Sequence, residues 1–227
     1  MDQPFRDRRD AGRQLARELE RFRPRNPVVL GLPRGGIPVA FEVAEHLGAM
    51  LDVFVVRKLG VPGHEELAMG AIASGGALVL NREVLEFMHI PLPIVEDVAQ
   101  READEVVRRD AMYRDDAPLV RVEGRTVLLV DDGLATGASM RAALSALRIL
   151  GPARLITAVP IAAPEACSQL LDAADEVICA HTPERFRAVG LWYKNFEQTS
   201  DDEVRRLLVT NRRHFARSRA PSRRAAG

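Results

Sequence analysis

Two adjacent acids, Asp131 and Asp132, stand at the centre of a segment whose residue types and spacing could do chemistry. The segment, residues 127–140, reads VLLVDDGLATGASM, and its first four residues form an apolar run that predicts a buried parallel strand. A loop of small residues follows the acids, and residues 140–150 then have a helical pattern that ends at Gly-Pro. The sequence thus predicts a strand, an acidic pair, a loop and a helix in succession.

The loop after the acids is suited to bind an anion. Gly137 lets backbone N–H groups approach an oxyanion, the following helix directs its positive end at the same point, and hydroxyl groups can add donors. The two carboxylates would repel that anion, so their expected targets are hydroxyl groups or a cation beside it. A ligand that combines a phosphate, a vicinal diol and bound Mg²⁺ meets all three requirements.

The segment VLLVDDGLATGAS resembles the phosphoribosyl-pyrophosphate motif of the type I phosphoribosyltransferases. An ordinary strand–turn–helix unit with a solvated acidic pair would not require this combination of acids, Thr-Gly and a capped helix. The resemblance implies that the acids hold the 2′- and 3′-hydroxyls of a ribose and that the loop holds its 5-phosphate. It assigns ribose and 5-phosphate binding to Asp131, Asp132, Gly133, Ala135, Thr136, Gly137, Ala138 and Ser139.

A second strand–loop–helix unit with an anion-binding tip comes earlier in the chain. Residues 28–36 predict a buried strand that runs into the loop Pro-Arg-Gly-Gly, and residues 37–47 predict a helix with proline in its first turn. In the family that the motif resembles, the loop after the first core strand binds pyrophosphate, which assigns that role to Arg34, Gly35 and Gly36. Two such tips on adjacent parallel strands would face one crevice.

Two further cations, Arg57 and Lys58, follow a third predicted strand at residues 51–56. At the carboxyl end of that strand they would suit a polyanionic leaving group, whereas a solvated strand end is the alternative. Together with the loop residues they complete the expected pyrophosphate site. Charge that grows on pyrophosphate as it leaves would be stabilised there, so Arg34 and Lys58, with Asp132, are the predicted catalytic residues.

Residues 59–69 show no clear period, and residues 70–80 predict a hairpin that turns at its Gly-Gly pair. The resemblance implies that a mobile loop at residues 59–69 closes on the reacting centre and excludes water. His64 and Glu65 lie in this loop. His64 could contact pyrophosphate or a metal, and it could equally be a polar loop residue without a role.

The acceptor side of the site is less defined. Aromatic residues gather in residues 181–196, either as a platform on which a planar base stacks or as a small satellite core. We favour Trp192 as the platform and Tyr193 as packing. Hypoxanthine-type members of the family carry an acid before Thr-Gly, where this chain has Ala135, so a hypoxanthine-type mechanism is in doubt. No general base is assigned, and the candidates are Asp132, Glu65 and His64.

The remaining segments predict the frame of a Rossmann-like, mostly parallel α/β sheet, because strands and helices alternate along the chain. Opposite charges spaced four residues apart in residues 81–116 indicate a structural, solvent-facing helix. The resemblance adds a small hood and a flexible loop or hairpin. Helices are expected at residues 5–22, 81–116 (interrupted near its prolines), 164–174 and 200–211, and strands at residues 155–161 and 176–179.

Composition limits the class of protein. The formal net charge of zero predicts no nucleic-acid partner, no apolar run reaches the roughly 20 residues of a membrane span, and the N-terminus lacks a secretory pattern. Cys167 and Cys179 form neither a metal pattern nor a disulfide framework, so we expect two small core residues. We expect one domain over residues 1–215, with a core at about residues 28–180, a hood at residues 181–215 and the helix at residues 5–22, before a disordered basic tail at residues 216–227.

We therefore predict a cytoplasmic enzyme that transfers a 5-phosphoribosyl group from phosphoribosyl pyrophosphate to a nitrogenous base and releases pyrophosphate. Mg²⁺ would bridge the pyrophosphate and the ribose hydroxyls near Asp131 and Asp132, and the resemblance implies a homodimer. A non-catalytic regulator that binds phosphoribosyl pyrophosphate or a nucleotide is the first alternative. Hydrolysis of the donor, with water as acceptor, is the second. The residues do not identify the acceptor base.

Overall fold

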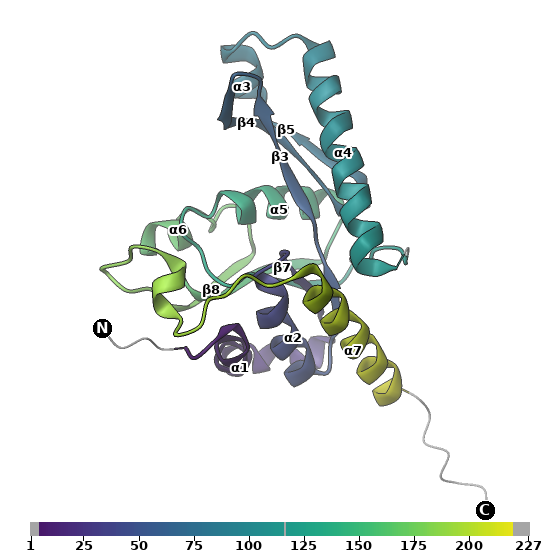
Figure 1. The fold of residues 1–227 in the computed structure, drawn as a ribbon, viewed down its shortest axis with the longest axis vertical. Helices are drawn as coiled ribbons and strands as arrows, with labels where there is room; N and C mark the ends of the chain where they lie inside the picture. The colour runs from purple at the N-terminus through teal and green to yellow at the C-terminus, as the bar shows by residue number, and fades with distance from the viewer. Residues whose placement is uncertain (1–4, 116, 220–227) are drawn as a thin grey trace, which may run out of the picture.

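Five strands form a parallel sheet at the centre of the molecule, in the order β2-β1-β6-β7-β8 (Figure 1). The computed structural model describes residues 5–115 and 117–219. The inner strands are buried apolar runs because helices cover both faces of the sheet, which confirms the predicted α/β class. The strands are β1 (Val28–Gly31), β2 (Met50–Val53), β6 (Thr126–Val130), β7 (Arg154–Ile161) and β8 (Glu176–His181).

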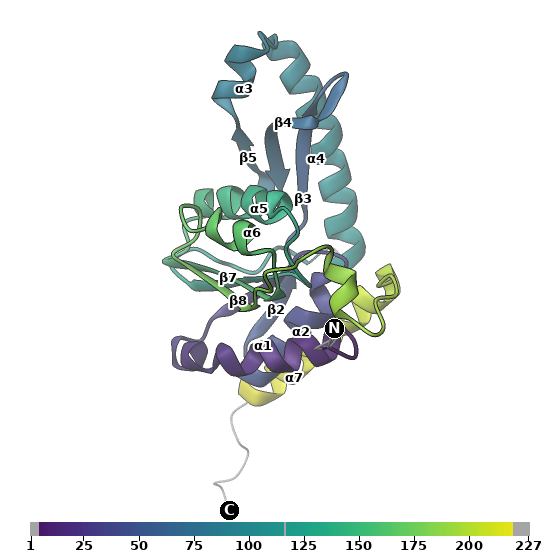
Figure 2. The same ribbon diagram turned by 90° about the vertical axis from the view of Figure 1, so that its left-hand side faces the viewer.

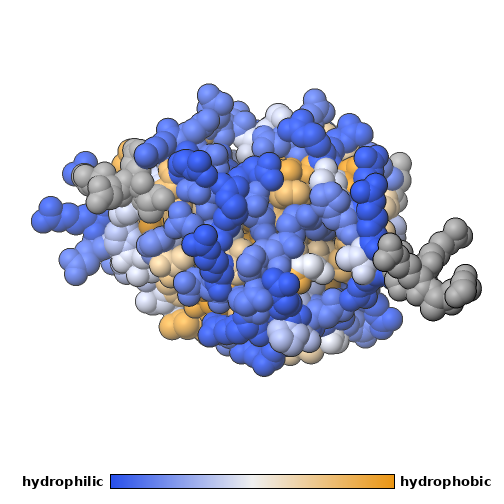
Figure 3. Space-filling view, turned by 90° about the horizontal axis from the view of Figure 1, so that it is seen from below, coloured by the Kyte–Doolittle hydropathy of each residue, from blue (hydrophilic) through white to orange (hydrophobic). Residues whose placement is uncertain are grey.

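Alternate strand residues pack against two helical layers. Val29 and Leu128 belong to the hydrophobic cluster under one face, and Val28 and Leu129 belong to the cluster over the other. Figure 2 shows the sheet between the two layers, and Figure 3 shows that the outer side of the lower layer is largely hydrophilic. The lower layer is α1 (Arg8–Glu18), α2 (Gly36–Leu47) and α7 (Asp201–Arg219); the upper is α5 (Ala138–Ile149) and α6 (Pro164–Ser168).

A second, antiparallel sheet and two helices form an arm that projects from the central sheet (Figures 1 and 2). The predicted turn is confirmed, since Gly75 and Gly76 adopt positive φ angles of 79° and 76° between the last two strands of the arm. The predicted interruption of the charged helical region is confirmed as well. The arm consists of β3 (Val56–Val61), β4 (His64–Ala73), β5 (Ala77–Leu80), α3 (Arg82–Phe87) and α4 (Leu92–Arg114).

The segment expected as an irregular loop, residues 59–69, is largely a β-hairpin of β3 and β4. Its pairing register shifts near Gly60, which explains why no strand period was visible in the sequence. Leu59 and Met69 are fully buried and anchor the hairpin in the arm. Arg57 and Lys58 consequently lie inside β3, and the prediction that they follow a core strand was wrong.

Three other elements differ from prediction in their bounds. The N-terminal helix ends at Glu18, and a 3₁₀ helix, Glu20–Arg25, follows it. α6 is a short helix that ends at Ser168, while α7 continues to Arg219. Residues 216–219 of the predicted disordered tail are therefore helical, and residues 220–227 lie outside the described residues. None of the helices in the described ranges combines the length and apolar character that crossing a membrane requires.

The two cysteines are joined by a disulfide, which corrects the expectation of two separate core residues. Cys167 lies in α6 and Cys179 in β8, and their Cα atoms are 6.8 Å apart. The chain reverses direction between α6 and β8, and this tertiary reversal brings the two thiols within bonding reach. Both residues also pack against the apolar cluster of the upper layer, as expected.

The last turn of α4 enters a buried ionic network, so this helix is not solvent-facing throughout. The side chain of Arg114 is 2% exposed, and its guanidinium contacts Asp52 Oδ1 at 3.0 Å and Asp110 Oδ1 at 2.6 Å. Ser74 Oγ donates to Asp110 at 2.8 Å, and the Val120 N–H donates to Asp52 Oδ2 at 2.9 Å. Burial raises the pKa of Asp110, although Arg114 and Ser74 oppose the shift. The network ties the arm to β2 and to the turn before β5.

Replacing Arg114 by alanine should destabilise the protein strongly, because Asp110 would lose the cation that it contacts and Asp52 would keep only Arg212, at 3.9 Å. Breaking a buried ion pair in this way costs roughly 3–5 kcal/mol. Arg101→Ala is the matched control, since Arg101 pairs with Asp97 at the same helical spacing on the exposed side of α4, at 3.5 Å. Urea unfolding followed by circular dichroism should show a large loss of unfolding free energy for Arg114→Ala and little change for Arg101→Ala. Equal midpoints for the two variants would contradict the role of the network.

Candidate functional site

The two predicted loops meet at one edge of the central sheet. β1 and β6 pair in parallel with Gly31 opposite Val130, so the loops that follow them leave the sheet side by side. A Cβ atom added to Gly35 would lie 2.1 Å from Asp132 Oδ2, and one added to Gly36 would lie 2.8 Å from the Val130 carbonyl oxygen. Only glycine fits these positions without displacement of the acidic strand end. The predicted juxtaposition of the two tips is therefore confirmed.

The acidic pair is crowded. Asp131 Oδ1 accepts a hydrogen bond from the Asp132 backbone N–H at 2.8 Å, and the side chain of Asp132 is 15% exposed. Burial raises the pKa of Asp131 well above its usual range, and the charge of Asp132 raises it further. Burial also raises the pKa of Asp132, and Arg8 opposes this shift. Two carboxylates in this position are suited to accept hydroxyl donors but resist full ionisation together.

The loop after the acids forms the start of a helix that is open to a ligand. Gly137 adopts the left-handed conformation with a φ of 71°, and α5 begins at Ala138, whose N–H donates to Thr136 Oγ1 at 3.4 Å. Gly133 is required for close packing, because a Cβ atom there would lie 2.6 Å from Val189 Cγ1. The helix start and its hydroxyl groups are placed to receive an anion. The exposed residues of the loop are Ala135, Thr136, Ala138 and Ser139.

Arg8 of α1 is a residue at this site that sequence analysis missed. Its Nε donates to Asp132 Oδ2 at 2.7 Å, and its Nη1 donates to the Glu197 carbonyl oxygen at 2.6 Å. Its guanidinium lies over the Phe196 ring, 3.8 Å from the centroid. In the sequence Arg8 is one of several arginines in an amphipathic helix whose polar face was expected to be solvated. No local pattern distinguishes it from the arginines that do face solvent.

Tyr193 holds the backbone of the acidic pair. Its hydroxyl donates to the Asp132 carbonyl oxygen at 2.5 Å, and its ring packs against Phe5 and stacks on Phe196. Burial, with a contribution from Asp132, raises the pKa of Tyr193. These contacts agree with the packing role predicted for Tyr193. Trp192 is half-buried beside the same cluster, and its role as a platform stays a prediction.

Arg34 extends toward the start of α7 and the last turns of α4. Its Nη1 lies 3.8 Å from Asp201 Oδ2, and the hydroxyl of Tyr113 donates to the other oxygen of Asp201 at 2.6 Å. A cavity of about 380 Å³ opens here, lined by Arg34, Arg108 and Arg109 among others. Three guanidinium groups thus line this cavity beside the Pro-Arg-Gly-Gly loop. Glu105 already pairs with Arg108 and Arg109, at 2.7 and 2.6 Å, which leaves Arg34 as the most loosely paired cation of the three.

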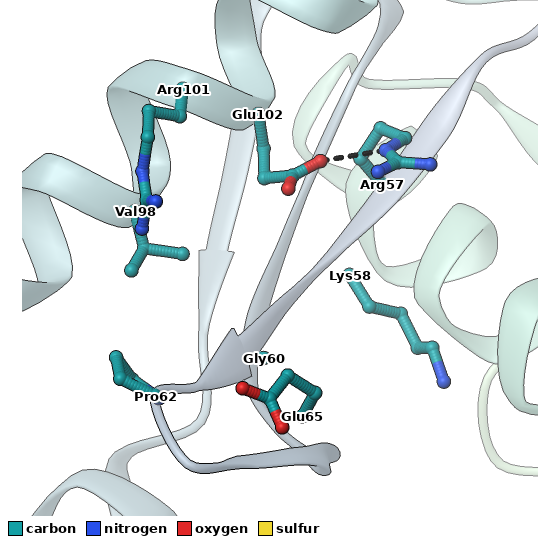
Figure 4. A pocket seen from close by; sticks show the side chains of 8 residues that line it. All are labelled: Arg57, Lys58, Gly60, Pro62, Glu65, Val98, Arg101 and Glu102. Atoms are coloured by element: carbon teal, nitrogen blue, oxygen red, sulfur yellow. Dashed lines mark hydrogen bonds and ion pairs between the residues drawn. The ribbon is translucent and has the colours of Figure 1, made fainter.

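Arg57 and Lys58 line a separate cavity in the arm, of about 550 Å³, between the hairpin and α4 (Figure 4). Arg57 Nε contacts Glu102 Oε2 at 2.6 Å, and Figure 4 shows Lys58 extending away from that ion pair. Glu65 also lines this cavity, and His64 is exposed at the start of β4. The structure therefore gathers these four residues in the arm, apart from the two glycine-containing loops on the core strands.

The donor set of the site fits Mg²⁺ only as a companion of a ligand. In residues 5–115 and 117–219 no group of three or more His, Cys, Asp or Glu side chains could hold a metal ion. Asp131 and Asp132 supply carboxylate oxygens on one side, which is what Mg²⁺ commonly uses when substrate phosphates complete its coordination. A Mg²⁺ ion carried on a polyphosphate is therefore compatible with these residues.

Comparison with known proteins points to the same family as the sequence motif. Residues 7–194 match the family model described as the phosphoribosyl transferase domain. The chain is 47% identical over 216 residues to MT0597 of Mycobacterium tuberculosis strain CDC 1551, a candidate phosphoribosyl transferase; the match covers 95% of this chain and 49% of that protein. It is 36% identical over 138 residues to the bifunctional protein PyrR of Chloroflexus aurantiacus, covering 56% of this chain and 66% of PyrR.

A solved structure resembles the whole fold. The crystal structure of TT1426 from Thermus thermophilus superposes with a TM-score of 0.83 at 47% identity, covering 91% of this chain and 98% of that one. The chain spans about half the length of the mycobacterial relative that it matches.

Gly35→Ala should destabilise the protein through a single steric clash. The added methyl group would overlap the Asp132 carboxylate, and overpacking of this kind costs about 1–3 kcal/mol. In an Asp132→Ala background the same substitution should cost little, because the colliding oxygen is gone. Thermal unfolding of the two single variants and the double variant measures this coupling. Strictly additive losses would show that the two loops do not touch as described.

Proposed function

The chain belongs to the phosphoribosyl transferase domain family, and on that premise we propose that it transfers a 5-phosphoribosyl group from phosphoribosyl pyrophosphate to a nitrogenous base. The observation that carries the proposal is the contact between the Pro-Arg-Gly-Gly loop and the acidic pair. In the donor, one ribose ring carries the 5-phosphate, the diol and the pyrophosphate. Groups that bind all three must therefore meet within the span of a single sugar, as these loops do.

Each part of the donor has a matching group at this edge of the sheet. Asp131 and Asp132 accept hydrogen bonds from the 2′- and 3′-hydroxyls. The start of α5, with Thr136 and Ser139, takes the 5-phosphate, because backbone N–H groups and the helix dipole favour an anion there. With its diol and its 5-phosphate both held, the ribose would present its anomeric carbon to the loop at residues 33–36.

Departure of pyrophosphate is assisted by the cation and the Gly35 amide of that loop. Gly35 brings its backbone N–H group close to the acidic pair without a side chain in between, and Arg34 supplies a positive charge in the same loop. The Gly36 N–H already donates to the Leu32 carbonyl oxygen at 3.0 Å, so Gly36 serves by lacking a side chain. Stabilising the charge that grows on the leaving group is usually the largest single term in such catalysis. Bound Mg²⁺ would neutralise part of the pyrophosphate charge in the same step. Lys58 can take part only if the arm brings it to the donor, so its catalytic role stays a prediction.

The acceptor base would enter from the side of residues 181–199, the part of the predicted hood that precedes α7 and contacts the acidic pair through Tyr193. Trp192 is half-buried there, and an indole ring is suited to stack on a planar base. The identity of the base and of the general base that accepts its proton stay open.

Replacing Asp131 and Asp132 together by asparagine should strongly weaken binding of phosphoribosyl pyrophosphate in the presence of Mg²⁺. Hydrogen bonds to a charged group contribute roughly 1.5–3 kcal/mol each, so the loss of two should weaken binding by at least about a hundredfold. Asp97→Asn with Asp172→Asn is the matched control, because both acids are exposed and lie outside the site. Isothermal titration calorimetry should give an unchanged dissociation constant for the control pair. Unchanged affinity in the folded Asp131/Asp132 variant would refute the donor site.

Trp192→Leu should raise the KM for the accepted base while leaving affinity for phosphoribosyl pyrophosphate nearly unchanged. Stacking on an aromatic face contributes about 0.5–1.5 kcal/mol beyond area burial, which corresponds to a several-fold rise in KM. Pyrophosphate release measured against a panel of bases identifies the base and gives both constants. Leu191→Ala, at an exposed neighbouring position, is the control. If Trp192→Leu leaves every kinetic constant unchanged, the acceptor stacks elsewhere.

A further inference from the structure

Arg8 is held more tightly than a surface arginine. Its side chain is 12% exposed, whereas those of Arg9 and Arg13 on the same helix are 51% and 43% exposed. Three contacts fix it at once: the Asp132 carboxylate at 2.7 Å, the Glu197 carbonyl oxygen at 2.6 Å and the face of the Phe196 ring at 3.8 Å. A guanidinium that is paired, hydrogen-bonded and stacked in this way has a single preferred geometry.

The N-terminal segment and the hood are assembled together around this arginine. The Phe5 N–H donates to the Trp192 carbonyl oxygen at 3.3 Å, and the Lys194 N–H donates to the Phe5 carbonyl oxygen at 3.0 Å. Tyr193 of the same stretch donates to the Asp132 carbonyl oxygen. Asp132 is therefore held at its side chain by the N-terminal helix and at its backbone by the hood.

Arg8 leaves part of Asp132 available. It engages Oδ2, and Oδ1 accepts no hydrogen bond from another residue within 5–115 or 117–219. The charge balance also matters, since two adjacent carboxylates would otherwise face a donor that carries several phosphate charges. A fixed guanidinium beside one carboxylate offsets that repulsion and keeps the second oxygen in a defined direction.

We propose that Arg8 is a positioning residue for the donor ribose: it fixes the Asp132 carboxylate and offsets its charge, so that Oδ1 accepts a ribose hydroxyl beside a polyanion. This inference rests on the proposed function. It assigns the N-terminal helix to the donor site, although its arginines looked like a solvated surface in the sequence. The donor could displace Arg8 only if all three contacts of Arg8 broke. The Arg8–Asp132 pair is therefore expected to stay intact when the donor binds.

The test compares Arg8→Gln with Arg9→Gln, its neighbour, which pairs with Glu42 at 2.5 Å on the exposed side of the helix. Calorimetric titration with phosphoribosyl pyrophosphate and Mg²⁺ should show affinity reduced by at least about tenfold for Arg8→Gln and unchanged for Arg9→Gln. Arg8→Lys, which keeps the charge, should recover part of the loss. With an accepted base, the KM for the donor should rise while the KM for the base stays near its original value.

A double-mutant cycle separates action through Asp132 from a general structural effect. In an Asp132→Asn background, Arg8→Gln should weaken donor binding far less than it does in the unaltered protein. Full additivity of the two losses would overturn the inference, as would unchanged or tighter donor binding by a folded Arg8→Gln variant. In those cases binding by the unaltered protein and by Arg9→Gln would leave the proposed function intact. Absence of donor binding by the unaltered protein would overturn both.

Discussion

Parallel pairing of β1 with β6 is the constraint on which the rest of the site depends. The two strands are far apart in the sequence, yet their register places Gly31 opposite Val130 and sends both following loops over the same edge. The loops can then touch only because Gly35 and Gly36 have no side chains. An acidic pair and an anion-binding turn consequently share one small volume, and that shared volume is what a ribose carrying phosphates at two positions requires.

Two adjacent, partly buried carboxylates are electrostatically unfavourable, and contacts from other elements offset this cost. Burial and the charge of Asp132 raise the pKa of Asp131, burial raises the pKa of Asp132, and Arg8 opposes both shifts. Tyr193 satisfies the Asp132 carbonyl oxygen, and Phe196 supports both the tyrosine and the arginine. The N-terminal helix and the hood thus belong to the proposed donor site through their contacts with the acids, and the arm is tied to the same core by the buried Arg114 network.

Sequence patterns predicted the features whose signal is local. The strand–loop–helix units around Gly35 and Gly137 were readable because apolar runs, glycines and helix ends occur within short windows. Features that arise only from tertiary contacts could not be predicted from such windows. Arg8 meets Asp132 across 124 positions, and the two cysteines meet only because the chain reverses between α6 and β8. The β3–β4 hairpin was hidden by a register shift at Gly60, which interrupts the alternation that would otherwise mark a strand.

The most direct measurement of the central claim is a crystal structure of the protein with phosphoribosyl pyrophosphate and Mg²⁺. The account predicts one donor molecule across the edge of β1 and β6, with its 5-phosphate at the start of α5, its diol on Asp131 and Asp132, and its pyrophosphate at Gly35 and Gly36. Arg8 should still contact Asp132 in that complex. A donor bound instead in the arm cavity beside Arg57, with the acidic pair unoccupied, would contradict the account.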